Sequence, residues 1–203
     1  MELVIATKNL HKLREYRLLL KKIKGLDILS LKDFPDYVPV EETGKTFEEN
    51  AELKAKDAAK KLGKFVLADD SGLVVPALDG EPGIFSARYA GKDATDLENR
   101  KELIKKIEKL PQAQRNSYYE CVICIADPEG AIKKNVKGFC EGEVITQERG
   151  NNGFGYDSIF VKYDYSKTFG ELDEMMKNEI SHRRKALDKA ISYLEEIAKR
   201  VAV

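Results

Sequence analysis

The chain has 203 residues, and its hydrophobic fraction of 42% is large enough to bury a full core. Its 35 Lys and Arg residues balance its 35 Asp and Glu residues, so a formal net charge of zero argues against nonspecific binding to nucleic acid or to a membrane surface. This length favours a single domain over residues 1–203, divided into two lobes. No apolar run is long enough to span a membrane and no signal-peptide pattern opens the chain, so we expect a cytoplasmic protein.

The first predicted elements are a strand and a helix joined by a polar turn. Glu2–Thr7 favours a strand, and Asn9 can cap a helix that runs from Leu10 to about Lys22. The turn Thr7-Lys8-Asn9-Leu10-His11-Lys12 places a hydroxyl, an amide and two lysines beside a helix N-terminus, where N–H groups and the helix dipole favour anions such as phosphate. A plain capped helix explains the same residues equally well, because the glycines of a Walker loop are missing.

A second strand, an acidic segment and a second helix follow. Leu26–Ser30 predicts the strand, and the irregular segment after it ends in Glu41-Glu42-Thr43-Gly44. Thr46 and Glu49 form a capping box for the helix, which Gly63 ends.

The stretch from Phe65 to Leu73 carries the strongest local signal. Four apolar residues lead into Asp69-Asp70-Ser71-Gly72, which predicts a buried strand that stops at the acids and sets them at its carboxyl end, where open α/β sheets bind ligands. Adjacent carboxylates repel each other unless a cation lies between them or one keeps a proton, so the pair indicates a divalent metal or a general base. The alternative is an acidic turn that caps the next segment.

The next predicted elements are a helix and a β-hairpin. A second capping box at Thr95 begins a helix that Pro111 ends. Tyr118–Ala126 and Ala131–Phe139 form an antiparallel pair around a turn, and a further strand is predicted over Glu143–Thr146. Together with the opening strand–helix unit, the hairpin makes the expected sheet mixed.

Two of the three cysteines lie on the first strand of this hairpin. Cys121 and Cys124 are three residues apart, which places them on opposite faces of a strand, where one metal ion could not join them. We therefore expect buried thiols that fill space rather than a zinc site.

The C-terminal third combines an aromatic loop with a long helix. The loop Asn151–Asp157, which contains Phe154 and Tyr156 between glycines, runs into a predicted strand over Ser158–Val161. Such aromatics suit stacking on a planar base, although aromatic residues that enter a core are about as common. Ser181 is expected to cap a helix that reaches Val201 and carries His182, Arg183 and Arg184 in its first turn.

Six motifs in one order give the chain a resemblance to the inosine triphosphate pyrophosphatase family, the Ham1-like pyrophosphatases of non-canonical purine nucleoside triphosphates. They extend over nearly the whole chain. The matching stretches are Ala6-Thr7-Lys8-Asn9 with Lys12; Glu41-Glu42-Thr43-Gly44 with Thr46-Phe47-Glu48-Glu49-Asn50-Ala51 and Lys54; Ala68-Asp69-Asp70-Ser71-Gly72-Leu73; Pro82-Gly83 with Ser86-Ala87-Arg88-Tyr89; Gly153-Phe154-Gly155-Tyr156-Asp157; and Lys177 with Ile180-Ser181-His182-Arg183. One departure is Gly170, where the family usually has alanine.

The resemblance implies both a fold and an activity. The fold would be α/β, with an elongated mixed β-sheet flanked by helices and two lobes around a central substrate cleft. The activity would be hydrolysis of ITP, dITP and XTP at the α–β phosphoanhydride to the monophosphate and pyrophosphate, with Mg²⁺ required. The protein would be a homodimer, and its role would be to cleanse the nucleotide pool.

The resemblance also implies roles for individual residues. Asp70 would be the proton acceptor and a metal ligand, and Glu41 a second ligand. The other matched positions carry over as substrate contacts: Thr7, Lys8, Asn9, Lys12, Lys54, Ser71, Phe154, Gly155, Tyr156, Asp157, Lys177, His182 and Arg183.

The chemistry of these residue types agrees with the assignment. A neutral protein must gather cations locally to bind a triphosphate, and matched positions that could do so with Mg²⁺ are Lys12, Lys54, Lys177 and Arg183. Lys54 lies off the apolar stripe of its helix, where a solvated charge is the usual explanation. Mg²⁺ takes one or two carboxylates and phosphate oxygens, which fits Glu41 and Asp70. A donor from His182 or Arg183 to a 6-oxo purine would disfavour ATP.

Two other functions compete with this hypothesis. A Maf-like nucleotide pyrophosphatase would act on other nucleotides, but the segments Ser181-His182-Arg183 and Gly153-Phe154-Gly155-Tyr156-Asp157 argue against it. A nucleotide sensor would bind ITP with Mg²⁺ and release no pyrophosphate. Rates of pyrophosphate release across several nucleotides distinguish the three.

Overall fold

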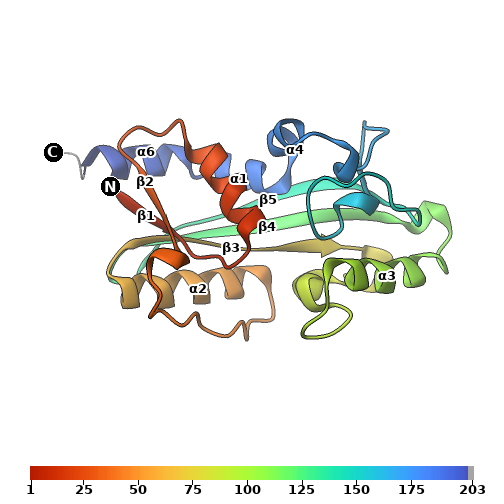
Figure 1. Ribbon diagram of the computed structural model, residues 1–203, viewed down its shortest axis with the longest axis horizontal. Helices are drawn as coiled ribbons and strands as arrows, with labels where there is room; N and C mark the ends of the chain where they lie inside the picture. The colour runs from red at the N-terminus through yellow and green to blue at the C-terminus, as the bar shows by residue number, and fades with distance from the viewer. Residues whose placement is uncertain (201–203) are drawn as a thin grey trace. The chain divides into compact units, whose positions relative to one another are not determined.

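A six-stranded sheet with the strand order β2-β1-β3-β4-β5-β6 is the framework of the fold in the computed structural model, which describes residues 1–200. Strand β1 pairs in parallel with β2 and β3, whereas β5 pairs antiparallel with β6, so the mixed α/β sheet is confirmed (Figure 1). The strands are β1 (Glu2–Ile5), β2 (Asp27–Ser30), β3 (Phe65–Val74), β4 (Asn116–Ala126), β5 (Ile132–Val144) and β6 (Phe160–Lys162). The helices are α1 (Leu10–Leu20), α2 (Phe47–Leu62), α3 (Asp96–Ile107), α4 (Glu174–Ile180), α5 (His182–Asp188) and α6 (Ile191–Arg200).

The chain divides into two compact units. Unit 1 comprises residues 1–70, 121–138 and those from 183 onwards, and unit 2 comprises residues 71–120 and 139–182. None of the described helices combines the length and the apolar character needed to cross a lipid bilayer.

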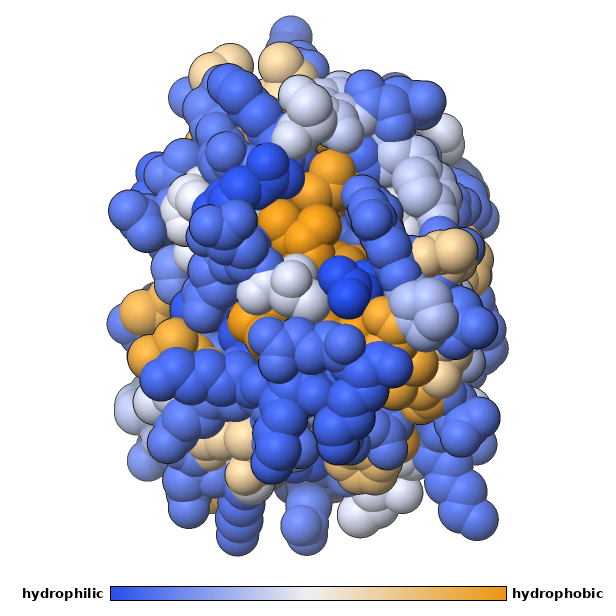
Figure 2. Space-filling model, turned by 90° about the vertical axis from the view of Figure 1, so that its right-hand side faces the viewer, coloured by the Kyte–Doolittle hydropathy of each residue, from blue (hydrophilic) through white to orange (hydrophobic). Residues whose placement is uncertain are grey.

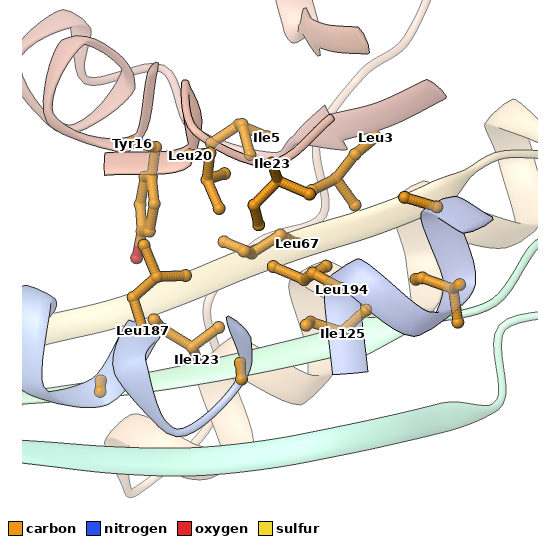
Figure 3. Close-up of a cluster of buried hydrophobic side chains, with 14 of the residues drawn as sticks. Leu3, Ile5, Tyr16, Leu20, Ile23, Leu67, Ile123, Ile125, Leu187 and Leu194 are labelled. Atoms are coloured by element: carbon orange, nitrogen blue, oxygen red, sulfur yellow. The ribbon is translucent and has the colours of Figure 1, made fainter. Parts of the chain in front are cut away.

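Unit 1 buries its main core on one face of its strands. Alternate residues of a strand share a face. Strands β3 and β4 are neighbours in the sheet, and Leu67 of β3 and Ile123 of β4 belong to one cluster on the same face. Helix α1 adds Leu20 to this cluster, and α5 and α6 add Leu187 and Leu194 (Figure 3). Residues far apart in the sequence therefore form one hydrophobic contact surface.

Helix α2 lies on the opposite side of the unit 1 strands from α1 and α6 (Figure 1). Its cap matches the prediction in part: the Thr46 hydroxyl accepts from the Glu49 N–H at 3.1 Å, but the Glu49 carboxylate accepts from the Lys45 N–H rather than from Thr46. Gly63 ends the helix in the left-handed conformation at φ 61°. Four fully buried alanines let α2 approach closely: Ala51, Ala55, Ala58 and Ala59.

Unit 2 has a core rich in aromatic rings. The rings of Tyr119 and Phe160 meet edge to face at 4.8 Å, and those of Phe160 and Phe169 at 5.0 Å. Leu103 and Ile107 of α3 are fully buried beside them. The face drawn in Figure 2 is mostly hydrophilic, with hydrophobic side chains gathered near its middle.

Gly170, the departure from the family pattern, lies in a tight part of unit 2. A Cβ atom there would stand 2.9 Å from the carbonyl oxygen of Arg149 and 2.9 Å from Cα of Ser158. Both are backbone atoms, so any side chain would require a backbone shift. The glycine is thus matched to its local packing.

The prediction that strand β3 stops at its acids is wrong, and so is the alternative of an acidic turn. The strand runs through Asp69 and Asp70 to Val74, and both acids are buried, with 2% and 7% of their surface exposed. Beyond the acids, Leu73 and Val75 are fully buried in the core of unit 2, which gives the extended chain a second apolar anchor.

Two predicted strand boundaries near β6 are also wrong. The residues 143–146 do not begin a new strand, because β5 continues to Val144 and pairs there with Phe160. The strand expected from Ser158 begins instead at Phe160, because Asp157–Ile159 form a 3₁₀ turn.

The long C-terminal helix is divided. Ser181 follows the last residue of α4, and α5 and α6 are separated at residues 189 and 190. The Ala190 N–H donates to the Leu187 carbonyl at 2.8 Å, a bond of three residues rather than four, which tightens the chain at this point. Val201, the predicted end, lies outside the described residues.

Candidate active site

Asp69 and Asp70 point to opposite faces of β3. The Asp69 carboxylate lies 2.9 Å from Lys12 Nζ and 3.4 Å from Arg183 Nη2. The Asp70 carboxylate lies 3.3 Å from Lys54 Nζ and accepts from Asn50 Nδ2 at 3.1 Å. Strand alternation thus separates the two carboxylates, and each has its own partners. A metal or a general base at Asp70 stays a prediction.

The Asp69 face is a buried ion cluster. Arg183, only 1% exposed, pairs with Glu15 of α1 as well as with Asp69. Burial by itself raises the pKa of the Asp69 carboxyl, but Lys12, Arg183 and Lys54 outweigh it and hold that pKa well below its ordinary range. Asp69 is thus ionised at neutral pH, and its Oδ2 lies close to both Lys12 and Arg183.

The Asp70 face has the opposite electrostatic balance. Burial raises the pKa of the Asp70 carboxyl above its ordinary value, and the attraction of Lys54 and Lys12 does not cancel this effect. The nearby charge of Glu42 raises the pKa further, whereas the hydrogen bond from Asn50 lowers it. A desolvated carboxylate with a raised pKa is a better proton acceptor than an exposed one.

Lys54 joins Asp70 to the acidic segment. Its Nζ lies 3.0 Å from Glu42 Oε1 and 3.3 Å from Asp70 Oδ1, so an ammonium stands between two carboxylates. Burial alone would lower the pKa of Lys54, but Asp70, Glu42 and Asp69 raise it above its ordinary value. The side chain is 14% exposed and is not on a solvated salt-bridge face.

The residues of the first turn have distinct positions. The Asn9 side chain accepts from the N–H groups of His11 at 2.9 Å and Lys12 at 3.1 Å, so the predicted cap is confirmed. Thr7 Oγ1 accepts from the Asn9 N–H at 3.1 Å. Lys8 is exposed, whereas Lys12 points inward to Asp69.

The aromatic loop of unit 2 is organised around Asp157. Its carboxylate accepts from the Phe154 N–H at 2.9 Å, from Lys177 Nζ at 2.6 Å and from the Tyr119 hydroxyl at 3.3 Å. Lys177 Nζ also lies 4.6 Å from the centre of the Phe154 ring, within the range of a cation–π contact. Three of the predicted substrate contacts therefore lie together.

Other predicted residues lie near these two groups. His182 is 4% exposed and its ring stacks on Tyr119 at 4.6 Å. The hydroxyl of Tyr156 donates to the Ser86 carbonyl at 2.8 Å. Ser71 follows Asp70 directly on β3 and is partly buried.

The predicted metal ligands have unequal positions. Asp70 is buried, whereas Glu41 is exposed and its neighbour Glu42 contacts Lys54. A cluster of three His, Cys, Asp or Glu side chains suited to a metal is not found in residues 1–200. Mg²⁺ binds through one or two carboxylates with waters and phosphate oxygens, so the acids around Lys54, already arranged about a cationic group, fit this ion chemically.

Three residues in these clusters were not expected from the sequence. Asn50 precedes Lys54 by four residues on α2, and Glu15 follows Lys12 by three on α1, spacings that put each pair on one helix face. Helical spacing could therefore have found both. Glu42 gives no such signal, because it lies in an irregular segment beside the equally acidic Glu41.

The fold and these clusters define an α/β protein in which two acids in the middle of β3 pair with basic residues of the surrounding helices. This set of groups suits a cation and a polyanion. The chain matches the Ham1 family model over residues 3–193. It belongs to the Ham1 family.

Individual relatives match almost the full length. The dITP/XTP pyrophosphatase of Protochlamydia amoebophila is 52% identical over 198 residues, which cover 97% of this chain and 99% of the relative. The dITP/XTP pyrophosphatase of Geobacillus kaustophilus is 47% identical, with coverage of 97% and 95%. The structure of a HAM1 protein from Coxiella burnetii superposes with a TM-score of 0.87 at 41% identity and covers 97% of this chain and 99% of that one.

Cys121 and Cys124 are buried thiols, as expected, and Cys140 is buried as well. Cys121 belongs to the unit 1 core, and desolvation raises its pKa to about 12. Desolvation likewise raises the pKa of Cys124 to about 12. Neither is poised as a nucleophile at neutral pH.

Proposed function

We propose that this protein is a nucleotide pyrophosphatase that hydrolyses ITP, dITP and XTP between the α and β phosphorus atoms. The products are the nucleoside monophosphate and pyrophosphate, and the reaction cleanses the nucleotide pool. Full-length relatives at about half identity are dITP/XTP pyrophosphatases, which supports this activity over that of a Maf-like enzyme.

The observation that carries the mechanism is the buried carboxylate of Asp70 beside Lys54 and Asn50. In the proposed reaction Asp70 accepts the proton of a water that attacks the α-phosphorus in line, and pyrophosphate leaves. Asn50 orients the carboxylate by its hydrogen bond. Lys54, held by Glu42, offers positive charge to the phosphate oxygens.

Mg²⁺ is proposed as the cofactor, with Asp70 and Glu41 as its ligands. We add the neighbouring acid Glu42 to this set; its contact with Lys54, which Asp70 shares, supports this choice. When bound, the ion would neutralise phosphate charge and aid departure of pyrophosphate.

The remaining predicted contacts divide into phosphate and base roles. We assign phosphate contacts to Lys12 and to the turn residues Thr7, Lys8 and Asn9, with Ser71 beside the catalytic acid. We assign the nucleobase to the loop Phe154-Gly155-Tyr156-Asp157 with Lys177, and donors to a 6-oxo group to His182 and Arg183. Two lobes with a central cleft, a homodimer and a cytoplasmic location complete the proposal.

The test is pyrophosphate release from ITP, dITP, XTP, GTP, ATP, dTTP and UTP, each with and without Mg²⁺. We expect fast release from the first three nucleotides and only with the metal. Binding of ITP with Mg²⁺ and no release would identify a sensor instead. Fast release from dTTP or UTP would contradict the assigned substrate class.

The variant Asp70→Asn tests the assigned base. We expect turnover to fall by about three orders of magnitude or more, because the proton acceptor is lost, while the thermal midpoint is retained. Asp27→Asn, an exposed acid on β2, is the matched control and should keep full activity. Near-normal turnover of Asp70→Asn would remove Asp70 from this role.

A further inference from the structure

The inner part of the aromatic loop is fixed by its own acid. Asp157 accepts from the Phe154 N–H at 2.9 Å, and Gly153 before it has a φ of 78°. A Cβ atom on Gly153 would stand 2.1 Å from Asp157 Oδ2, so only glycine fits this turn. One side of the Phe154 peptide is therefore held within the loop.

The outer part of the loop is held by helix α3. The Gly155 N–H donates to Asp96 Oδ2 at 2.7 Å, and the Gly155 carbonyl accepts from Arg100 Nη1 at 2.8 Å. Asp96 and Arg100 are four residues apart, so they share one face of α3. Both backbone hydrogen-bonding groups of Gly155 are thus bound by one rigid element.

Arg100 is braced by a second contact. Its Nε lies 2.7 Å from Glu148 Oε2, and the same carboxylate accepts from the Ser158 hydroxyl at 3.0 Å. The Arg100 side chain is 17% exposed. A planar guanidinium held by a carboxylate on one edge can present its other N–H groups in a fixed direction, which a lysine cannot do as well.

We propose that Asp96 and Arg100 are positioning residues that fix Gly155 and thereby the ring of Phe154 for nucleobase stacking. The inference rests on the proposed role of Phe154 in base binding. Gly153 and Gly155 flank Phe154, and both have positive φ values. The bond to Asp157 holds the Phe154 N–H, so the backbone that follows Phe154 depends on the contacts from α3. We call the contacts of Asp96 and Arg100 with Gly155 the clamp. Without the clamp, the loop must be ordered when the nucleotide binds, which weakens binding and leaves the chemical step unchanged.

The kinetic signature is a rise in KM at constant kcat. Loss of one well-placed base stack typically corresponds to about tenfold or more in binding. We expect Arg100→Ala and Asp96→Ala each to raise the KM for dITP about tenfold, with kcat within about twofold. Asp96→Asn keeps an acceptor oxygen and should restore a near-normal KM. Lys101→Ala, at an exposed position on α3, is the control and should change neither constant.

A double-mutant cycle separates positioning from general stabilisation. If Arg100 acts through Phe154, Arg100→Ala should add little to the KM of Phe154→Ala, because the ring that it positions is gone. Additive effects, or a fall in kcat at constant KM, would overturn the inference. Arg100→Lys, with its thermal midpoint measured, replaces Arg100→Ala if the alanine variant does not fold, and an unchanged KM there would also overturn it.

Failure of the clamp and failure of the base assignment give different results. An unchanged KM in Arg100→Ala, with a raised KM in Phe154→Ala, overturns the clamp alone. An unchanged KM in Phe154→Ala removes the base assignment, and the clamp falls with it. If the wild-type protein releases no pyrophosphate from dITP, the same variants are compared by the Kd of dITP, so failure of the proposed activity and failure of the clamp stay distinguishable.

Discussion

The two faces of β3 at Asp69 and Asp70 differ although the residues are neighbours. On the first face, Asp69 and Glu15 meet Arg183 and Lys12, and the pKa of Asp69 lies far below its ordinary range. On the second face, Asp70 and Glu42 share the ammonium of Lys54, and the pKa of Asp70 is raised. The first balance keeps Asp69 ionised among cations, and the second suits chemistry with a cation.

This difference teaches that the environment, rather than residue type, decides what an acid does. The two carboxyls are equal in charge and nearly equal in burial. They differ in the number of cations that the packed helices bring to each face. Variants that affect one face at a time can therefore separate the contributions of the two carboxyls to stability.

The largest effect on stability is expected from Asp69→Asn. This change leaves the buried Arg183 and Lys12 with one carboxylate fewer, and breaking a buried ion pair typically costs about 3–5 kcal/mol in unfolding free energy. Urea denaturation would measure the loss. Asp27→Asn should stay within about 0.5 kcal/mol, and an equally small loss for Asp69→Asn would show that the cluster adds no stability.

The stability gap between wild type and Asp69→Asn should depend on pH. A carboxyl with a lowered pKa in the folded state adds stability that is complete above its unfolded pKa, about 3.9, and is lost as pH falls towards its folded pKa. The gap should therefore be full at pH 7 and shrink below about pH 4. Denaturation curves at several pH values would measure it, and a gap that grows in acid would contradict the sign of the shift.

A smaller loss is expected when the helix behind Asp70 loses its cap. Thr46→Ala removes the hydroxyl that accepts from the Glu49 N–H and should lower the unfolding free energy by about 1 kcal/mol. Helix α2 carries Asn50 and Lys54, so turnover should fall only as far as the population of folded protein falls. Thr46→Ser keeps the cap and should behave as wild type.

The smallest effect on stability is expected from Asp70→Asn. Because the folded state raises the pKa of Asp70, folding disfavours its charged form, and a neutral amide of similar size should leave the unfolding free energy unchanged or slightly higher. Equilibrium denaturation at pH 7 would measure this. A large loss of stability would show that the Asp70 carboxylate, as expected for Asp69, stabilises the folded state.

Local patterns predicted much of this molecule. The Asn9 cap, the Thr95 capping box and the Gly63 stop are confirmed because each depends on hydrogen bonds within a few residues. The mixed sheet and the membership of the Ham1 family are confirmed as well. The predicted substrate contacts and metal ligands stay predictions, although Lys54 with Asp70 and Lys177 with Asp157 are brought together.

The errors arose where distant segments decide the outcome. Strand β3 continues past its acids because Leu73 and Val75 find a second core, and the C-terminal helix is divided at residues 189 and 190. The residue pattern of one segment does not show which distant segments will pack against it. The same limit applies to the acidic segment. The sequence predicts Glu41 as a metal ligand, whereas Glu42 is the acid that contacts Lys54.

By itself the sequence determined the family, the capped starts of α1, α2 and α3, and the acids and bases that the proposed mechanism uses, because motifs and caps are local. Only the tertiary structure decided which partners each acid has. Arg183 meets Glu15 across 168 residues of chain, and it does so because α1 and α5 pack on the same face of β3. Electrostatic balance depends on such packing, and therefore Asp69 and Asp70, alike in sequence, differ in chemistry.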